Sequence, residues 1–562
     1  MRLTRNVMNH FSKAGIQKDI SRTAFKTPFS HTTTFNSGKL VPFFFQECVP
    51  GDTVQIEATG MVARMQTPLV PVMGTAMLDY WYFFVPNRLV WDNFKEFMGE
   101  NTKGPWSNNL PERMIPIINT SDPQNHITSG SSADYLGLPL GSFGGISALP
   151  FRGIRQIWND WFRSTAVDDP LLVNKGDLEP RYSVGPQNFD LLPVNKFPDY
   201  FTTALPSPQY GEPVSIGLGT LADVFADDSL ISADLLDKTN SLLWRDIYNS
   251  PEDNAYYGYP LEAYPVQGNG GSVTEFQTVS KSVDEYDIYE RSFKPVNLKA
   301  DLRNAGVITV NDLRVAFQIQ KYKETQARGG SRYTEILESI WSVSSPDSRL
   351  QRTEYIGGDR ALVSMSQVIQ NSSSVENSPL GNAAGFSKTS TRGGTVTYAV
   401  PEHGFVVGLL AVRPIHTYQQ GIDRYWKKRN VFDFYNPLLA NIGETPVYAY
   451  ELYATQANSN TSTPDIFGYQ EAWADYRYKR SYVSGEMRSG IQNSLDIYHY
   501  GDYYATQPTL SPGWLHEDPA LIDRTISVSS DVANQFICDI YIDLTMIRPM
   551  PAYSIPGLID HA

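Results

Sequence analysis

A run of aromatic residues that starts at Asp79 constrains the fold of this chain more than any other segment. Residues 79–91 read Asp-Tyr-Trp-Tyr-Phe-Phe-Val-Pro-Asn-Arg-Leu-Val-Trp, a run too short and too polar at its flanks to cross a membrane. Apolar side chains at successive positions are typical of a strand that is buried on both faces, as in sheets packed against other sheets or subunits. Pro86 and Asn87 predict that this strand ends abruptly. The segment therefore indicates a densely packed β protein and not a catalytic loop.

The composition also favours an all-β chain. The 562 residues include 33 Tyr, 27 Phe, 37 Pro and 41 Gly, which is typical of many short strands joined by long turns. Apolar and polar residues alternate over 536–546, and shorter strand patterns occur at 54–58, 394–400, 404–412 and 447–453. Because strands come from both ends of the chain, we expect an eight-stranded jelly roll, a Greek-key β-sandwich, with long loop insertions.

A few short helices are expected inside the loops. Residues 154–162 place apolar side chains at the three- and four-residue spacing of an amphipathic helix. Residues 311–325 open with a capping residue, contain no Gly or Pro, and are followed by Gly329-Gly330, which would stop a helix. The polar stretches 371–395 and 454–465 are predicted to be surface loops.

The net charge of −14 is distributed unevenly along the chain. Residues 212–290 contain fifteen acidic and three basic residues, a charge of −12, whereas residues 1–26 contain six cations and one acid, a charge of +5. We therefore expect residues 1–40 to be a basic N-terminal arm on an inner surface, whose order depends on a partner. The remaining parts are 41–211 and 301–562, which form the core with its loops, and an acidic, Tyr-rich surface insertion at 212–300.

No motif for catalysis stands out. P-loop, HExxH, G-x-S-x-G and dinucleotide-binding motifs are missing from the sequence, and Cys48 and Cys538 lack the spacing of a zinc site or a disulfide framework. His403 beside Glu402 fits a turn between strands better than a catalytic base. We therefore expect no enzyme activity and no catalytic residue.

Cofactors and membranes are also not indicated. Asp227-Asp228 fits a solvated loop better than a cation site, because Ca²⁺ takes six or more oxygen ligands, and so neither a metal nor a cofactor is expected. The N-terminus has no signal-peptide pattern, and the longest apolar runs have the length of a strand. The sequence thus predicts neither secretion by a signal peptide nor membrane insertion.

Basic residues suggest three nucleic-acid-binding surfaces. The arm could neutralise phosphates without reading bases, and two later clusters interleave cations with aromatic rings on which single-stranded bases could stack. Contact between subunits is the alternative for both clusters, and a solvated tail is the alternative for the arm. The candidates are Arg2, Arg5, Lys13, Lys18, Arg22 and Lys26 in the arm, Arg424, Trp426, Lys427, Lys428 and Arg429 in the second surface, and Arg477, Lys479 and Arg480 in the third.

The acidic insertion carries tyrosines, which provide rigid, amphipathic contact area. Repulsion from packaged nucleic acid would place such an acidic segment on an outer surface. Host attachment is therefore one interpretation of residues 212–300, and a spacer or subunit-contact loop is the other. The candidate attachment residues are Tyr248, Tyr256, Tyr257, Tyr259 and Tyr264.

Segment 79–91 and six further segments resemble, in order along the chain, the major capsid proteins of gokushoviruses, in the Microviridae family of single-stranded DNA bacteriophages. The further segments are 31–36, 158–163, 311–318, 327–333, 467–471 and 556–561, and we expect the likeness to be weakest between about 212 and 300. The resemblance implies a viral jelly roll, sixty copies in a small T=1 icosahedral shell around single-stranded DNA, and protrusions formed by the insertion near the threefold axes.

The same resemblance implies where such a protein works and what it meets. It would be part of the virion and would be assembled in the cytoplasm of a bacterial host. Its partners would be other copies of the chain, the DNA genome and a host cell-surface receptor. Because six cations in the arm are few, a small DNA-condensing viral protein is a further expected partner.

Two other classes remain open from the residues alone. A β-sandwich polysaccharide hydrolase would bind sugar rings on aromatic platforms and cleave with two carboxylates, for which Glu47 or Asp79 could be nominated without a visible partner. An adhesion module would explain the tyrosines but not the basic arm. Assembly separates these classes, because a hydrolase or adhesin should stay small whereas a capsid subunit should form particles or pentamers.

Overall fold

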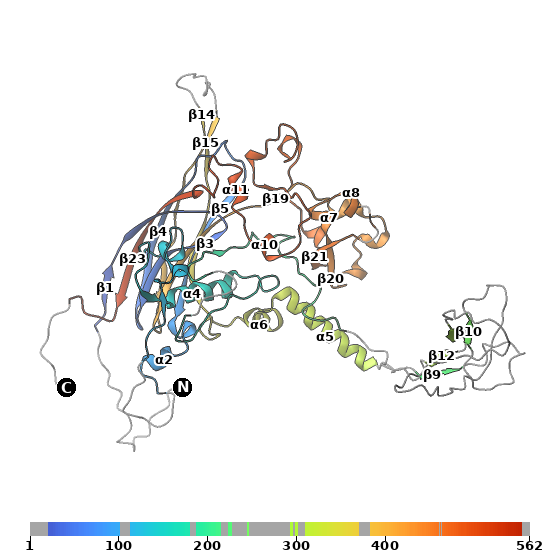
Figure 1. Ribbon diagram of the computed structural model, residues 1–562, viewed down its shortest axis with the longest axis horizontal. Coiled ribbons are helices and arrows are strands. Elements are labelled where there is room, and N and C mark those ends of the chain that lie inside the picture. Colours follow the sequence, from blue (N-terminus) through green and yellow to red (C-terminus); the bar gives the residue numbers. More distant parts are fainter. Residues whose placement is uncertain are drawn as a thin grey trace, which may run out of the picture. The chain divides into compact units, whose positions relative to one another are not determined.

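Two large antiparallel sheets contain most of the long strands of the structure (Figure 1). The structure, a computed structural model, describes residues 21–101, 113–179, 187–214, 223–226, 244–246, 293–295, 298–301, 310–369, 383–459, 461 and 464–553. The chain divides into two compact units, which we call unit 1 (Met1–Tyr210 with Lys323–Ala562) and unit 2 (Gly211–Tyr322). Both large sheets belong to unit 1, so the described part of this unit is mainly β with short helices.

The first sheet has six strands arranged around its longest members. β23 pairs with β4 on one side and with β1 and β2 on the other, while β16 and β17 pair with the free edge of β4. Buried and more exposed residues alternate along β23, which confirms the strand predicted at 536–546. The strands are β1 (Thr23–Lys26), β2 (Phe29–Phe35), β4 (Thr53–Met65), β16 (Thr389–Arg392), β17 (Val396–Ala399) and β23 (Phe536–Arg548).

The inward face of β4 changes partway along the strand. Val54 and Ile56 point into the core at one end, whereas Met61 and Ala63 do so at the other, so the buried positions shift from even to odd numbers. The cause is a bulge opposite Asp543, which adds one residue to β4 and moves every later side chain to the other face.

The second sheet has five strands and contains the aromatic run as β5. This strand ends at Pro86, as predicted, and nearly all of its side chains are buried. The strand order is β13-β5-β18-β3-β8, so β5 is an inner strand with neighbours on both sides. Its members are β3 (Lys39–Cys48), β5 (Ala76–Pro86), β8 (Leu192–Pro193), β13 (Glu354–Leu362) and β18 (Gly404–Pro414).

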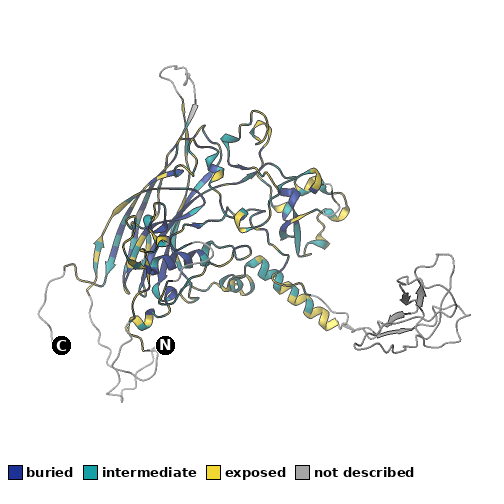
Figure 2. Ribbon diagram, viewed as in Figure 1, coloured by how far each residue is buried: buried dark blue, intermediate teal, exposed yellow. Residues whose placement is uncertain are grey.

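The two faces of β5 are buried against different partners. Tyr80, Tyr82 and Phe84 belong to the core that the two sheets share, and the Tyr82 hydroxyl meets Thr59 Oγ1 of the opposite sheet at 2.8 Å. Phe83 and Val85 pack on the other side against helical residues. Burying one large apolar side chain stabilises a fold by about 1.5–3 kcal/mol, so this double-sided strand is a main source of stability. Figure 2 shows the buried residues concentrated in these sheets.

Helices cover the outer face of the second sheet. α4 (Leu149–Ile157) continues into a π-helical turn, η2 (Trp158–Phe162), which confirms the helix predicted at 154–162. Ile154, Ile157 and Trp158 are buried in the same cluster as the outer face of β5 and β18. The aromatic run therefore needs no second sheet or second subunit to bury its outer face.

α5 (Val310–Gly329) spans the boundary between the two units. It confirms the helix predicted at 311–325 and ends where Gly330 adopts a positive φ of 96°, a conformation that glycine accepts without strain. The described strands of unit 2 form two pairs, which are β9 (Asp223–Ala226) with β12 (Leu298–Asp301) and β10 (Trp244–Asp246) with β11 (Phe293–Pro295).

Short elements complete unit 1 around the sheets. The paired strands are β6 (Ile117–Asn119) with β7 (Gly145–Ser147), β14 (Met365–Ile369) with β15 (Ala383–Ser387), β19 (Thr417–Tyr418) with β22 (Gly501–Asp502), and β20 (Glu444–Tyr448) with β21 (Ile466–Glu471). The short helices include α1 (Asn87–Val90), α2 (Phe94–Phe97), α3 (Ser132–Tyr135), α6 (Tyr333–Trp341), α7 (Ala449–Leu452), α8 (Gln456–Ser459), α9 (Ala474–Arg477), α10 (Pro512–Leu515) and α11 (Ala520–Asp523).

Three local predictions differ from the structure. Residues 23–35, expected in a free arm, form β1 and β2, because the exposed edge of β23 offers them backbone partners. The strand expected at 447–453 ends at Tyr448, where the Glu451 carboxylate accepts a hydrogen bond from the Tyr448 amide and the chain enters α7. The expected loops at 371–395 and 454–465 contain β15, β16 and α8, whose polar residues are held by pairing and local hydrogen bonds.

Candidate functional site

Two cations of the predicted arm are held by the first sheet. The Arg22 guanidinium donates hydrogen bonds to the Gly51 carbonyl at 2.5 Å and to Thr53 Oγ1 at 3.0 Å. Lys26 forms ion pairs with Asp543 at 3.2 Å and with Glu57, and the hydrogen bond to Asp543 is the main reason that its pKa is raised. The other four cations, Arg2, Arg5, Lys13 and Lys18, lie outside the described residues.

The second predicted surface lies on and after a 3-10 turn, η5 (Arg424–Lys427). Arg424 is mostly buried and pairs with Glu451 at 3.1 Å, while Lys427 donates to the Ser459 carbonyl. Lys428 pairs with Asp475 at 2.8 Å. Burial alone would lower the pKa of Lys428, but its hydrogen bonds and charge interactions with Asp475 and Tyr476 together outweigh burial and raise the pKa. Trp426 and Arg429 are exposed.

The third predicted surface lies beside the second one. Lys428 pairs with Asp475 in α9, and Arg480 pairs with Asp423 at 3.1 Å, so two ion pairs join segments about fifty residues apart. Arg477 pairs with Glu471 at 2.9 Å, and Lys479 is exposed. Acidic residues adjoin both basic clusters in the sequence, Asp423 before Arg424 and Asp475 before Tyr476. They are a signal from which such pairs could have been predicted, but the sequence-based prediction did not include them.

Internal pairing determines what these joined surfaces can bind. Each carboxylate partner compensates a cation that would otherwise attract phosphate, so Arg424, Lys428 and Arg480 add little positive potential for a nucleic acid. The exposed side chains that remain, Trp426, Arg429 and Lys479, offer one large ring and two cations. Internal pairing therefore makes this surface less basic than its sequence suggests.

The carboxylates nominated for catalysis are engaged in structural ion pairs or lie apart. Asp79 is buried in β5, and its carboxylate pairs with the guanidinium groups of Arg360 and Arg413, so it has a structural role between two arginines. Glu402 pairs with Arg88 at 2.5 Å and so does not orient the neighbouring His403. Glu47 is exposed on β3. This arrangement lacks the two cooperating carboxyl groups that glycoside hydrolysis uses.

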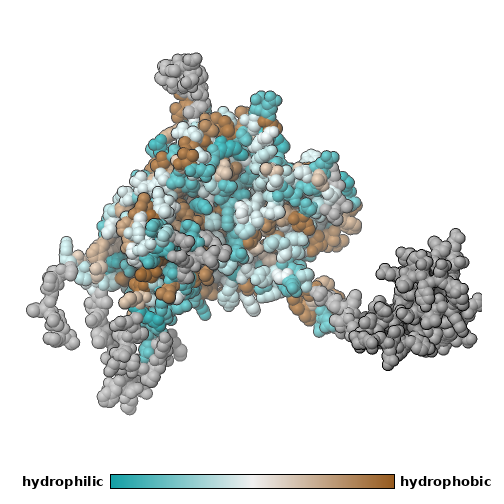
Figure 3. All heavy atoms as spheres, viewed as in Figure 1, coloured by the Kyte–Doolittle hydropathy of each residue, from teal (hydrophilic) through white to brown (hydrophobic). Residues whose placement is uncertain are grey.

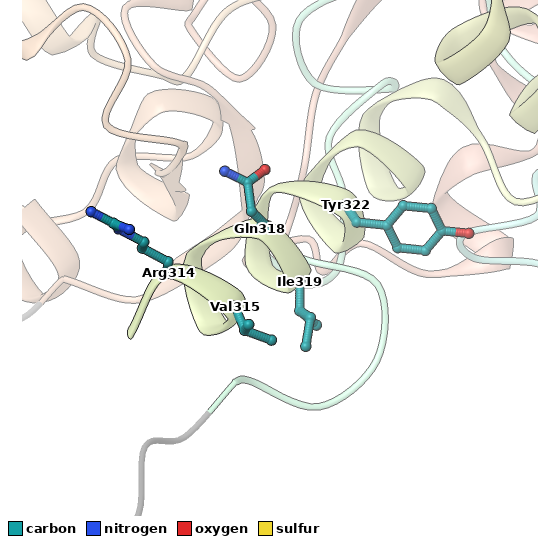
Figure 4. Close-up of a pocket in the computed structure, with 5 residues that line it drawn as sticks. All are labelled: Arg314, Val315, Gln318, Ile319 and Tyr322. Atoms are coloured by element: carbon teal, nitrogen blue, oxygen red, sulfur yellow. The ribbon is translucent and has the colours of Figure 1, made fainter. Parts of the chain in front are cut away.

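An open depression along α5 does not resemble an active site. It has a volume of about 350 Å³ and is lined by apolar surface of Val315, Ile319 and Tyr322 together with Arg314 and Gln318 (Figure 4). Over the part of the chain that the structure describes, no group of three or more His, Cys, Asp or Glu is placed to hold a metal ion. Burial raises the pKa of the Cys48 and Cys538 thiols to about 12, so they are not nucleophiles at neutral pH.

A buried ionic cluster around His416 was not expected from the sequence. The ring contacts Asp502 through Nδ1 at 2.9 Å and Glu517 through Nε2 at 2.8 Å, and all three side chains are nearly inaccessible. Burial alone would lower the pKa of His416, but the two carboxylates outweigh it and raise the pKa to about 9. His416 is 86 residues from Asp502 and 101 residues from Glu517 in the sequence, so no local pattern could have indicated this cluster.

The predicted attachment residues Tyr248, Tyr256, Tyr257, Tyr259 and Tyr264 lie outside the described residues, as do Asp227 and Asp228. No described helix is both long enough and apolar enough to span a bilayer.

The described surfaces present exposed aromatic and charged side chains, which are suited to contact with other macromolecules. The family model for the capsid protein (F protein) matches residues 14–558. The chain therefore belongs to this family, the capsid proteins of Microviridae phages, and is a structural protein of the virion and not an enzyme.

Similar curated proteins support the same assignment. The capsid protein VP1 of Spiroplasma virus 4 is 35% identical over 555 residues, which cover 96% of each chain. The capsid protein VP1 of Chlamydia phage 1 is 33% identical, also with 96% of each chain covered. That of Bdellovibrio phage phiMH2K is 34% identical over 96% of this chain and 95% of its own. Membership implies that copies of this chain form a shell around the genome.

Proposed function

We propose that this chain is the major capsid protein of a small T=1 icosahedral shell, in which sixty copies with a jelly-roll core enclose a single-stranded DNA genome. Assembly would take place in the cytoplasm of the bacterial host. A closed icosahedral shell requires each copy to present different surfaces around fivefold, threefold and twofold axes. Weak contacts repeated over many copies then stabilise the particle collectively.

The strand order of the two large sheets carries this proposal. In chain order the eight principal strands are β2, β3, β4, β5, β13, then β16 and β17 counted together as the sixth, and finally β18 and β23. Across the first sheet, neighbouring strands are the first, eighth, third and sixth of this series. Across the second sheet they are the second, seventh, fourth and fifth. This alternation of strands between two sheets is the order expected of two interlocked Greek keys, the jelly-roll arrangement common in viral capsids.

Particle formation is the direct test. The purified chain, alone and with single-stranded DNA, would be sedimented and any fast fraction imaged by electron microscopy. We expect uniform small spheres, or pentamers that complete shells when the other viral proteins are co-expressed. A chain that stays monomeric under all of these conditions would contradict the proposal.

The basic N-terminus is proposed to bind packaged DNA on the inner surface. Exchanging Arg2, Arg5, Lys13 and Lys18 for Gln, while keeping Arg22 and Lys26 for the sheet, should lower DNA content per particle and leave shell yield unchanged. DNA and protein in purified particles would be measured by absorbance, with Lys95→Gln in α2 as the exposed control. Unchanged DNA content would contradict a role of these four cations in DNA binding.

Since four cations neutralise few phosphates, a small DNA-condensing viral protein is proposed as a further partner.

The insertion is proposed to bind a receptor on the host surface. Asp246 of β10 pairs with Phe293 of β11, so an Asn-Gly turn can replace residues 247–292 while keeping both strands. This deletion removes all five candidate tyrosines. We expect normal particles that no longer adsorb to host cells, measured by sedimentation and by adsorption assays against the full-length particle. Failure to form shells would instead assign the insertion to assembly.

A further inference from the structure

The loop after η5 carries a group of apolar side chains that its own chain leaves uncovered. Val431, Phe432 and Leu438 are 80, 78 and 91% exposed, and Tyr425 and Trp426 beside them are also exposed. Figure 3 shows hydrophobic surface in the part of unit 1 that contains β20 and β21. Single exposed apolar residues are ordinary on a protein surface, but five within one short segment, made of η5 and the loop after it, are not. We call these five residues the 425–438 patch.

The backbone that presents the 425–438 patch is held in place by hydrogen bonds. The Asp433 carboxylate accepts from the amides of Arg429 and Asn430, at 2.8 and 2.7 Å, which fixes the turn η6 (Val431–Asp433). Asn436 caps the next turn, η7 (Pro437–Leu439), through the Leu438 amide. A loop held this way cannot simply fold its apolar side chains inward, so it is pre-organised to present them to a partner.

A ring layer beneath the patch ties the loop to α9. Tyr435, Trp473 and Tyr476 pack edge to face, with ring centres 5.7–6.2 Å apart. The Trp473 indole N–H donates to the Leu439 carbonyl at 2.9 Å, and the Lys428 ammonium lies 3.9 Å from the centre of the Tyr476 ring. These ring contacts hold the loop against α9, while Tyr435 and Tyr476 themselves stay about half exposed.

We propose that the 425–438 patch is a contact surface for a second copy of this chain in the assembled shell. The proposal rests on shell assembly as the proposed function. A shell of identical copies must bury surface of this chain against itself, and apolar, aromatic side chains on a rigid loop are what the centre of such an interface uses. Nucleic acid fits this surface less well, because Arg424, Lys428 and Arg480 are each paired with a carboxylate of the same chain.

Substitution at two highly exposed positions of the loop tests the contact. Phe432→Asp with Leu438→Asp should lower the yield of particles by about tenfold or more, because charge placed at the centre of an apolar interface must be desolvated. The unassembled variant should keep the thermal unfolding midpoint of the unchanged chain, since neither side chain is buried. Phe432→Leu with Leu438→Met keeps the surface apolar and should restore particles. Normal particle yield for the Asp variant would overturn the proposal.

A photo-crosslinker distinguishes the two possible occupants. Benzoylphenylalanine at position 432 of particles should produce a nuclease-resistant species of two joined chains. An adduct that nuclease digestion removes would assign the patch to DNA, and a product confined to one chain would exclude a second copy. If the unchanged chain forms no particles even with the other viral proteins, the proposed function in shell assembly is contradicted. If the unchanged chain and the Asp variant assemble equally well, only the proposed role of the 425–438 patch is contradicted.

Val532→Asp is the matched control for added charge. Val532 is 79% exposed on a turn that begins at Ser529, so it resembles the patch residues in type and exposure. Particle yield close to that of the unchanged chain is expected. A loss equal to that of the Asp variant would show a general effect of surface charge and would overturn the assignment of the patch.

Discussion

Replacing His416 with Gln is expected to destabilise the unassembled chain by about 3 kcal/mol near pH 6, where the imidazole is doubly protonated. In this state both ring nitrogens donate, to Asp502 on one side and to Glu517 on the other. Gln has similar reach but no charge, so it leaves two buried carboxylates without a cation between them. Urea unfolding of the two proteins gives the difference, with the exposed His126→Gln as control.

The pH dependence of this difference identifies the charge on His416. The folded-state pKa of about 9 lies above the ordinary value of 6.5, so the stabilisation is fully present below pH 6.5 and is lost as the pH rises towards 9. Burial alone would raise the pKa of Asp502, but the interactions with His416, Lys196 and Tyr504 together outweigh burial and lower the pKa. This carboxylate therefore stabilises the fold above its ordinary pKa and less as the pH falls. A difference between the two proteins that stays constant from pH 6 to 9 would contradict a charged imidazole.

Arg152→Met is expected to lower the free energy of unfolding by about 3–5 kcal/mol. The guanidinium is 1% exposed, pairs with Glu179 at 2.6 Å, and donates to the carbonyls of Val90, Gly176 and Leu178. These bonds connect α4, which covers the outer face of the second sheet, to an earlier segment at Val90 and to a later segment at Gly176 and Leu178. Met would fill much of the volume but would leave the buried carboxylate and three carbonyls without this donor.

A double variant separates the charge from the packing at this site. Arg152→Met with Glu179→Leu removes both charges, so we expect it to be more stable than Arg152→Met alone, as is found when buried ion pairs are replaced by apolar residues. Lys95→Met on α2, an exposed position, should change stability by less than about 0.5 kcal/mol. Urea unfolding measures all three variants. A loss below about 1 kcal/mol for Arg152→Met would indicate that the ion pair contributes little.

Local sequence patterns were sufficient to predict the helices and strands that bury one regular face. β23 alternates because strand geometry sends successive side chains to opposite faces, and α4 with η2 follows the helical spacing of its apolar residues. β5 was recognised from unbroken apolar character, although its outer cover proved to be helical. The paired acids Asp423 and Asp475 were visible beside the basic clusters, but only the folded chain showed which cations they hold.

By itself, the sequence determined that this is an all-β chain with a central strand buried on both faces, because these properties depend on the period and polarity of neighbouring residues. Only the tertiary structure decided that residues 23–35 join the sheet, that β4 changes face at a bulge, and that His416 lies between two carboxylates. Each of these depends on which distant segments become neighbours. The pairing of distant segments is favoured when it leaves few backbone groups unpaired and few buried charges uncompensated over the whole fold. A local sequence pattern contains no information about this property.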